Sequence, residues 1–205
     1  LILDTDAHVG DGTCDIFYER KDVLFISIHQ DPRTPIYPAN REVYTFSPRD
    51  RERAHLWKYL EKHVGEGEGI GYSVNVPLPP RSFWKCYELA FDEIVLPIVE
   101  EFKPDVVVRN GGSDPHFSDG LTDMGLTVHD FKRMGERIRR MNIGTVDLIG
   151  SGYSPVFPYA ISALVSGLTG VDLPTKEPFP IPKWIGDRTI FEKAENNIKN
   201  VKKNL

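Results

Sequence analysis

Apolar residues along the chain gather in short runs that alternate with segments of helical pattern. The runs predict buried strands at 1–4, 23–28, 72–76, 105–108 and 146–149. Segments of helical pattern lie between and after them, at 13–19, 83–102, 127–141, from 154 onward and at 189–204. Strands separated by helices are typical of a parallel sheet. The sequence therefore predicts an α/β fold in which a parallel sheet carries helices on both faces.

Prolines mark two of the predicted boundaries. Pro97 is expected to kink or divide the helix at 83–102, and a proline-rich turn at 77–80 is expected to close the third strand. The stretch 32–68 is the least regular part of the chain. Its arginine-rich section, 49–53, is more typical of a solvated helix face than of a site.

Capping signals set the start of two further helices. Thr127 and Asp130 are placed as an N-cap residue and its capping-box partner. Ser154 and Pro155 offer the next helix a cap and a proline at its first position. The last helix, at 189–204, is rich in charged residues and is expected to lie on the surface.

Length and charge narrow the class of protein. The 205 residues are enough for one domain, which is expected to span 1–205. The net charge of −5 argues against direct binding of nucleic acid, because phosphates require a basic surface. No apolar run approaches the ~18–20 residues that a membrane span needs, and no signal peptide is visible.

The cysteines and the first residue add two expectations. Cys14 and Cys86 lie far apart and in no metal or redox spacing, which predicts a reducing, cytoplasmic location. Leu1 is not an initiator methionine, and the apolar run that begins with it is typical of the middle of a buried strand. The chain is therefore expected to be the C-terminal portion of a larger domain.

Three polar clusters each follow a predicted strand. They are 4–8 (Asp-Thr-Asp-Ala-His), 110–119 (NGGSDPHFSD) and 150–153 (GSGY). Ligands of open parallel sheets bind outside the carboxyl ends of the strands. Three clusters at equivalent strand ends are therefore expected to converge, and this placement is stronger evidence than any one motif.

The first two clusters contain a candidate zinc site. Asp6 and His8 are two residues apart, so both side chains point the same way on an extended strand. Asp114 would supply a third ligand and leave the fourth position to water or a substrate carbonyl. Alone, an Asp-x-His pair is as often a hydrogen-bonded strand end, and an aspartate in such a turn is more often a cap. Their shared place at strand ends favours the metal.

The third cluster places a tyrosine in a glycine-rich loop. By itself, Tyr153 would be an aromatic anchor of a mobile loop. Beside a metal, its phenol is a candidate donor to a developing oxyanion, and the glycines on either side of Ser151 permit a close backbone approach.

These motifs together resemble the zinc-dependent deacetylase family of histone deacetylases, acetylpolyamine amidohydrolases and acetoin-utilisation proteins. The resemblance extends from Leu1 to about Gly170. It rests on DTDAHVGDGT, FISIHQ, GEGEGIGYSVNVPLP, GGSDPHFSDGL and GSGY in this order. It implies the arginase/deacetylase fold and hydrolysis of an acetylated amine such as acetyl-lysine, with metal-activated water.

The resemblance also assigns roles to residues. It implies Zn²⁺ as cofactor, with Tyr153 polarising the acetamide carbonyl. Asp4 and Asp11 match the two acids that orient a pair of active-site histidines. The residues that match the three zinc ligands are Asp6, His8 and Asp114, and those that match a monovalent cation site, commonly potassium, are Asp4, Asp6, His8, Ser27 and Ile28.

The family's tandem histidines, which supply the general base, precede the matched stretch. None of the six histidines here takes their place: His55, for example, lies in a helical or surface segment. A further N-terminal segment of the same protein is the expected source of the base. The alternative is a non-catalytic, zinc-binding scaffold of the same fold.

Three questions stay open at the level of sequence. An arginase-like pair of metals is disfavoured, because Gly10 and His116 stand where further carboxylates would be needed. The substrate could be acetylated protein, polyamine or a small molecule, since rim loops set that choice. The role of the longer stretch 41–63 and the existence of a homo-oligomer are not determined.

Overall fold

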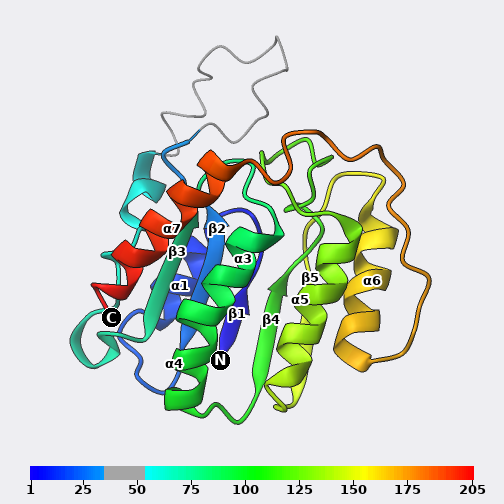
Figure 1. The fold of residues 1–205 in the computed structure, drawn as a ribbon. Coiled ribbons are helices and arrows are strands. Elements are labelled where there is room, and N and C mark those ends of the chain that lie inside the picture. The colour runs from blue at the N-terminus through cyan, green and yellow to red at the C-terminus, as the bar shows by residue number, and fades with distance from the viewer. Residues whose placement is uncertain (35–53) are drawn as a thin grey trace.

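The protein is built around a five-stranded parallel sheet, seen in a computed structural model that describes residues 1–34 and 54–205 (Figure 1). The strands lie in the order β3-β2-β1-β4-β5 and are all parallel. Their bounds are β1 Ile2–Asp4, β2 Phe25–Gln30, β3 Ser73–Leu78, β4 Val107–Gly111 and β5 Thr145–Ile149. The predicted parallel α/β architecture is therefore confirmed, with each strand displaced by at most two residues from its expected start.

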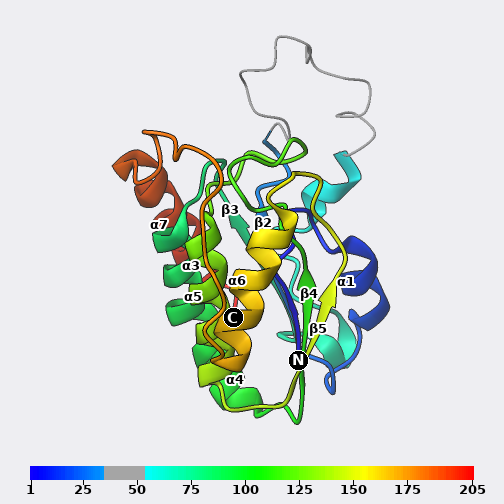
Figure 2. The ribbon, with the colours of Figure 1, turned by 90° about the vertical axis from the view of Figure 1, so that its right-hand side faces the viewer.

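Helices cover both faces of the sheet, but unequally. Figure 2 shows α1 on one face and the helices α3, α4, α5 and α7 on the other, with α6 beside α5. The α-helices are α1 Asp11–Phe17, α3 Trp84–Ala90, α4 Leu96–Phe102, α5 Val128–Arg140, α6 Phe157–Thr169 and α7 Arg188–Lys202. Short 3₁₀ turns are formed by Ala54–Lys58 and Gly67–Gly69. Of the longer stretch 41–63, residues 41–53 lie outside the described part.

The order of the strands creates a crevice at one end of the sheet. The chain starts in β1, moves outward through β2 and β3, and then returns to the opposite side of β1 to form β4 and β5. The loops that follow β1 and β4 therefore lead away in opposite directions, which opens a cleft outside their carboxyl ends. Asp4 is paired with Asn110 in register, so the two strands end side by side.

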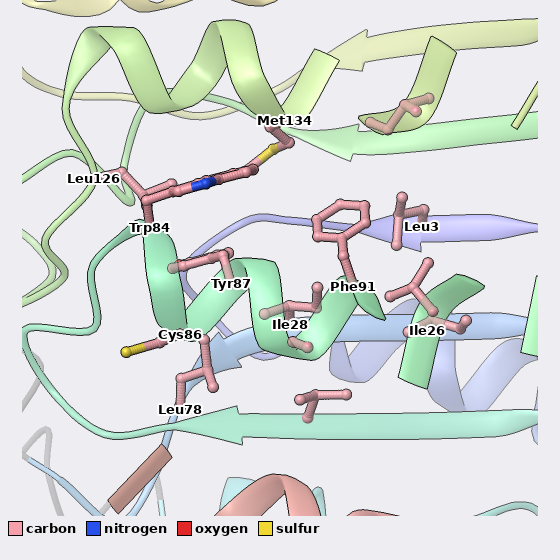
Figure 3. Packing of buried hydrophobic residues seen from close by; sticks show 14 of the residues in the cluster. Leu3, Ile26, Ile28, Leu78, Trp84, Cys86, Tyr87, Phe91, Leu126 and Met134 are labelled. Atoms are coloured by element: carbon pink, nitrogen blue, oxygen red, sulfur yellow. The ribbon is translucent and has the colours of Figure 1, made fainter. Parts of the chain in front are cut away.

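The larger core lies between the sheet and the helices α3 to α7. Figure 3 shows Leu3 and Ile26 from the sheet beside Phe91, with Ile28 close to Tyr87. All five side chains are fully buried, and burial of a large apolar side chain stabilises a fold by about 1.5–3 kcal/mol. This core fixes β1 and β2, and with them the residues that follow their carboxyl ends.

Two proline effects differ from the sequence-based expectation. Of the two alternatives for Pro97, a kink or a division, the division is not seen: a π-helical segment, Phe91–Val95, joins α3 to α4, and α4 continues through Pro97. The wider turn accommodates a residue that has no N–H to donate. The third strand does not close at Pro77 but continues to Leu78, which is tolerated because β3 lies at the edge of the sheet that the described residues form.

Of the two helix starts with a predicted cap, the structure confirms that of α5 but not that of α6. The capping box of α5 is present, since the Asp130 carboxylate accepts hydrogen bonds from the backbone N–H and the hydroxyl of Thr127. The predicted start of α6 at Ser154 and Pro155 is wrong, because the helix begins at Phe157. Ser154 instead forms a turn before it, in which its carbonyl accepts the N–H of Phe157 at 3.0 Å.

The last helix is more than a solvated surface element. Asp187 caps it by accepting the N–H of Thr189 at 2.8 Å. Its inner face buries Ala194, Ile198 and Val201 in the main core. The helix therefore helps to cover β3 and α3, which explains why a charged sequence nevertheless holds one apolar stripe.

The opposite edge of the sheet is apolar and open. Within residues 1–34 and 54–205, β5 pairs with β4 alone. Val146, Leu148 and Ile149 are each about half exposed along it. A long unpaired edge of this kind is open to pairing with a further strand.

Among the described helices, none has both the length and the apolar character needed to cross a membrane.

Helices α5 and α6 touch where each carries a glycine. A Cβ at Gly167 would overlap the carbonyl oxygen of Lys132, and one at Gly135 would overlap that of Leu164. We expect Gly167→Ala to lower the free energy of unfolding by about 1–3 kcal/mol, as overpacking does, in denaturant titrations. The matched variant Gly144→Ala, where no atom lies within 4 Å, should change it by less than about 0.5 kcal/mol. Equal effects would contradict this packing.

Candidate metal centre and active site

Residues from three separate loops meet in the crevice beside β1 and β4. Asp6 and His8 follow β1, Asp114 follows β4, and Tyr153 follows β5. The three side chains from the first two loops come together. The expected convergence of strand-end clusters is therefore seen in the geometry.

The centre of the site is a close contact of one imidazole with two carboxylates. His8 Nδ1 lies 3.0 Å from Asp6 Oδ1 and 2.9 Å from Asp114 Oδ2. Backbone N–H groups orient both acids: that of His8 donates to Asp6 Oδ1, and that of Ala7 donates to Asp114 Oδ2. Asp114 is fully buried, whereas Asp6 and His8 are partly open. One side of the cluster thus remains accessible.

The donor set of this cluster fits zinc. One ligand atom from each of Asp6, His8 and Asp114 lies within 4.8 Å of the other two. Ligand atoms around a tetrahedral zinc are about 3.3 Å apart, given its bond lengths to nitrogen and oxygen. The Oδ1 atom of Asp114 is buried without a hydrogen-bond partner among the described residues. Outward shifts of the three ligand atoms by about 0.3 Å would make room for the ion.

The charges of the cluster are strongly coupled. Burial opposes the charged form of His8, but hydrogen bonds to Asp114 and Asp6 outweigh it and raise the pKa of His8 to about 10. Burial also opposes the charge of Asp6, yet its hydrogen bond with His8 holds the pKa of this carboxyl below the usual range. Burial raises the pKa of Asp114 to about 7. Metal ligands must be deprotonated, so a cation would replace the proton that His8 holds.

Asp4 lies directly beneath the loop that carries the cluster. Its carboxylate accepts the N–H of Asp6 at 3.0 Å and the side-chain amide of Asn110 at 3.1 Å. Burial raises the pKa of Asp4 to about 6. A Cβ at Gly10 would lie only 2.5 Å from Asp4 Oδ2, so only glycine allows the loop to pack this closely. Asp4 is thus held by an amide and the backbone.

Three of the residues expected at a monovalent cation site, Asp4, Ser27 and Ile28, lie on the neighbouring strands β1 and β2, and Asp6 and His8 follow β1. Ser27 is the register partner of Asp4, and Ile28 follows it on β2. The Ser27 hydroxyl is hydrogen-bonded to His29 Nδ1 at 2.8 Å. The two side chains with oxygen donors are therefore adjacent in the sheet.

A cavity of about 360 Å³ reaches the cluster at His8, the one of its three residues that lines the cavity. His8, Asp11 and Tyr153 all line it, so the structure brings the expected tyrosine and the second expected acid to the same space. Tyr153 is 65 % exposed. Its phenol is therefore free to contact a molecule that enters the cavity.

Two titratable residues that the sequence does not indicate also line the cavity, Asp31 and His55, and only His55 is an imidazole. It comes from the 3₁₀ turn Ala54–Lys58, and its Nε2 atom lies 3.9 Å from Asp11 Oδ2. It is exposed, as expected for a surface segment, but that surface borders the cavity. No sequence pattern indicates this, because the contact joins residues 44 positions apart.

Comparisons with known proteins identify the family. The family model described as histone deacetylase domain matches residues 1–168. The chain belongs to this family. It is 35 % identical over 213 residues to a probable deacetylase of Archaeoglobus fulgidus, an alignment that covers 98 % of this chain and 54 % of the relative. It is 39 % identical to an acetylpolyamine amidohydrolase of Burkholderia pseudomallei, over 74 % of this chain and 39 % of the relative.

Solved structures of family members share the fold. The acetylpolyamine aminohydrolase of Burkholderia pseudomallei matches with a TM-score of 0.68 and 32 % identity, covering 83 % of this chain and 44 % of the other. An HDAC homologue solved in complex with SAHA matches with a TM-score of 0.69 and 28 % identity, covering 97 % and 45 %. The chain spans about half the length, or less, of these relatives.

Removal of a ligand tests the metal centre directly. We expect zinc to bind the purified protein and to raise its melting temperature, because binding to the folded state stabilises it. Asp6→Ala should weaken zinc binding, measured by calorimetry, by more than the about 10–100-fold typical of residues that only orient a ligand. Asp130→Asn changes a buried carboxylate outside the site and should leave the affinity unchanged. Equal zinc affinity in Asp6→Ala would contradict this assignment.

Proposed function

We propose that the protein hydrolyses the amide bond of an acetylated amine with the help of a zinc ion held by Asp6, His8 and Asp114. The observation that carries this proposal is the meeting of His8 Nδ1 with the two carboxylates at 2.9–3.0 Å, at the opening of a cavity. Support also comes from family relatives that are named deacetylase and acetylpolyamine amidohydrolase.

The residues of the chain would divide the work as follows. When bound, a zinc ion polarises a carbonyl group and lowers the pKa of a water molecule. Tyr153 donates a hydrogen bond from its phenolic O–H to the carbonyl oxygen of the acetyl group as negative charge develops there. Asp6 and Asp114 would balance the two positive charges of the ion, and His8 would add a neutral nitrogen donor. The cavity would hold the acetyl group between His8 and Tyr153, which both line it.

Removal of a proton from the attacking water requires a base. We assign this role to an imidazole from a part of the polypeptide outside these 205 residues, with Asp4 and Asp11 accepting N–H groups of such imidazoles. A carboxylate in this position fixes the tautomer and the ring orientation. Asp11 borders the cavity and Asp4 lies behind the metal cluster, which are suitable places for two such contacts.

A potassium ion at Asp4, Asp6, His8, Ser27 and Ile28 is part of the same proposal. The adjacency of Asp4 and Ser27 across the β1–β2 register supports it. A cation beneath the loop would offset the negative charge that Asp4 brings into a buried position. Its role would be to hold the backbone on which Asp6 and His8 stand.

A non-catalytic zinc-binding module is the second candidate. It is favoured by one observation: among the six histidines, all of them described, only His8 and His55 line the cavity. Acetate release separates the two candidates. The complete, zinc-loaded polypeptide should release acetate from at least one member of a panel of acetyl-lysine peptides and acetylpolyamines. A panel without any release would favour the binding module.

Tyr153→Phe tests the oxyanion donor. Removal of one such hydrogen-bond donor typically costs about 10²–10³ in rate, so kcat for acetate release should fall by this factor. Zinc binding should be unchanged, since among the described residues the group that could hold the ion consists of Asp6, His8 and Asp114, without Tyr153. If the variant lost its zinc, Tyr153 would have a structural role instead.

His55→Ala tests whether the base lies within the chain. Removal of a general base typically costs about 10²–10⁴ in rate. We expect kcat to fall by less than about tenfold, well below that range, because His55 is exposed and its Nε2 atom lies 3.9 Å from Asp11 Oδ2, beyond hydrogen-bond distance. A loss of 100-fold or more, about the lower limit for a base, would make His55 the base and remove the need for an external one.

A further inference from the structure

The backbone that carries Tyr153 is not fixed by its own sequence. Gly150 and Gly152 lie just before the tyrosine, and Gly152 has a φ of +127°, which side chains other than glycine rarely adopt. Glycine loses more conformational freedom on folding than other residues do. The position of the phenol must therefore be set by contacts from outside this loop.

Asp119 supplies the most direct of these contacts. It lies five residues after Asp114 on the same loop and is only 2 % exposed. Its Oδ2 atom accepts the backbone N–H of Tyr153 at 3.1 Å, and its Oδ1 atom accepts that of Leu121 at 2.8 Å. Each carboxylate oxygen thus has its own N–H donor. One side chain ties the loop of the tyrosine to the loop of the metal ligand.

A second anchor holds the residue after the tyrosine. The Ser154 hydroxyl is hydrogen-bonded to the Ser118 hydroxyl at 2.8 Å, and the latter lies 2.9 Å from His116 Nδ1. His116 Nε2 lies 3.0 Å from Glu177 Oε2. The anchor therefore runs from the tyrosine loop to the segment that precedes α7.

The proton positions in this anchor can be assigned from its donors. The backbone N–H of Ser118 points at His116 Nδ1 at 3.1 Å, so this nitrogen accepts. Burial lowers the pKa of His116, which keeps the ring neutral. The single ring proton is then on Nε2 and is donated to Glu177. These hydrogen bonds tie the loop that carries Asp119 to the segment before α7.

We infer that Asp119 is a positioning residue for Tyr153, which it holds through the backbone at a fixed distance from Asp114. The inference rests on the proposed function, in which Tyr153 stabilises the oxyanion. Misplacement of a reacting group by about 1 Å can cost on the order of 10²-fold in rate. A carboxylate that touches neither substrate nor metal therefore contributes to turnover.

Asp119→Asn in the complete, zinc-loaded polypeptide is the first test. An amide has one acceptor oxygen, so its NH₂ group faces one of the two N–H donors and that hydrogen bond is lost. We expect kcat to fall by about 10–100-fold, with KM and zinc affinity nearly unchanged. In the Tyr153→Phe background the same substitution should lower kcat by less than about twofold, because residues that act as a unit are not additive. Additive losses would overturn the inference.

Asp130→Asn is the matched control. Asp130 is also a buried carboxylate that accepts a backbone N–H, that of Thr127, but it does not contact the tyrosine loop. The Asp130→Asn substitution should lower the melting temperature and leave kcat unchanged. If Asp130→Asn lowered kcat as much as Asp119→Asn, the effect would be one of general stability, and the inference would fail.

Amide hydrogen exchange provides a readout that does not depend on activity. In the wild type the Tyr153 N–H is hydrogen-bonded and should exchange slowly. Asp119→Asn should speed exchange in the 150–156 segment by at least about tenfold, and Asp130→Asn should not. Unchanged exchange in Asp119→Asn would overturn the positioning role. If the wild type itself released no acetate, the proposed function would be overturned instead, so the two failures are distinguishable.

Discussion

A contact between side chains 106 residues apart is the interaction on which the site depends. His8 Nδ1 and Asp114 Oδ2 lie 2.9 Å apart and join the loop after β1 to the loop after β4. This is possible only because the sheet reverses its direction of growth between these two strands. Asp114 is fully buried, and an unpaired buried carboxylate is costly. The imidazole of His8, alone or together with a metal ion, therefore stabilises the buried carboxylate in this crevice.

Close packing of the backbone allows the loops to meet. A Cβ at Gly112 would overlap the carbonyl oxygen of Ser151, which accepts the N–H of Ser113 at 3.1 Å. A Cβ at Gly10 would crowd Asp4 in the same way. Glycines therefore bring the three loops within reach of one another. Two other glycines, Gly150 and Gly152, leave Tyr153 without a stiff backbone of its own, and buried polar side chains, Asp119 foremost, supply the order instead.

Much of the fold could be predicted, because strands and helices here follow local patterns. The capping box at Thr127 is a short-range signal and was found at its expected place. The boundary errors have tertiary causes. Pro77 stays within β3 because that strand lies at an edge, and the sequence does not state which strand is at an edge. The helix across Pro97 stays continuous because its neighbours bury both halves.

By itself, the sequence determined which reactive side chains the site can use and that each follows a strand: an Asp-x-His pair, a further aspartate and a tyrosine preceded by glycines. These depend on residue type and on short spacing, which any strand end preserves. Only the tertiary structure decided which of them meet, that His55 borders the cavity, and that Asp119 holds the tyrosine loop. Such contacts join residues that are far apart in the chain, so they are set by strand order and packing rather than by local pattern.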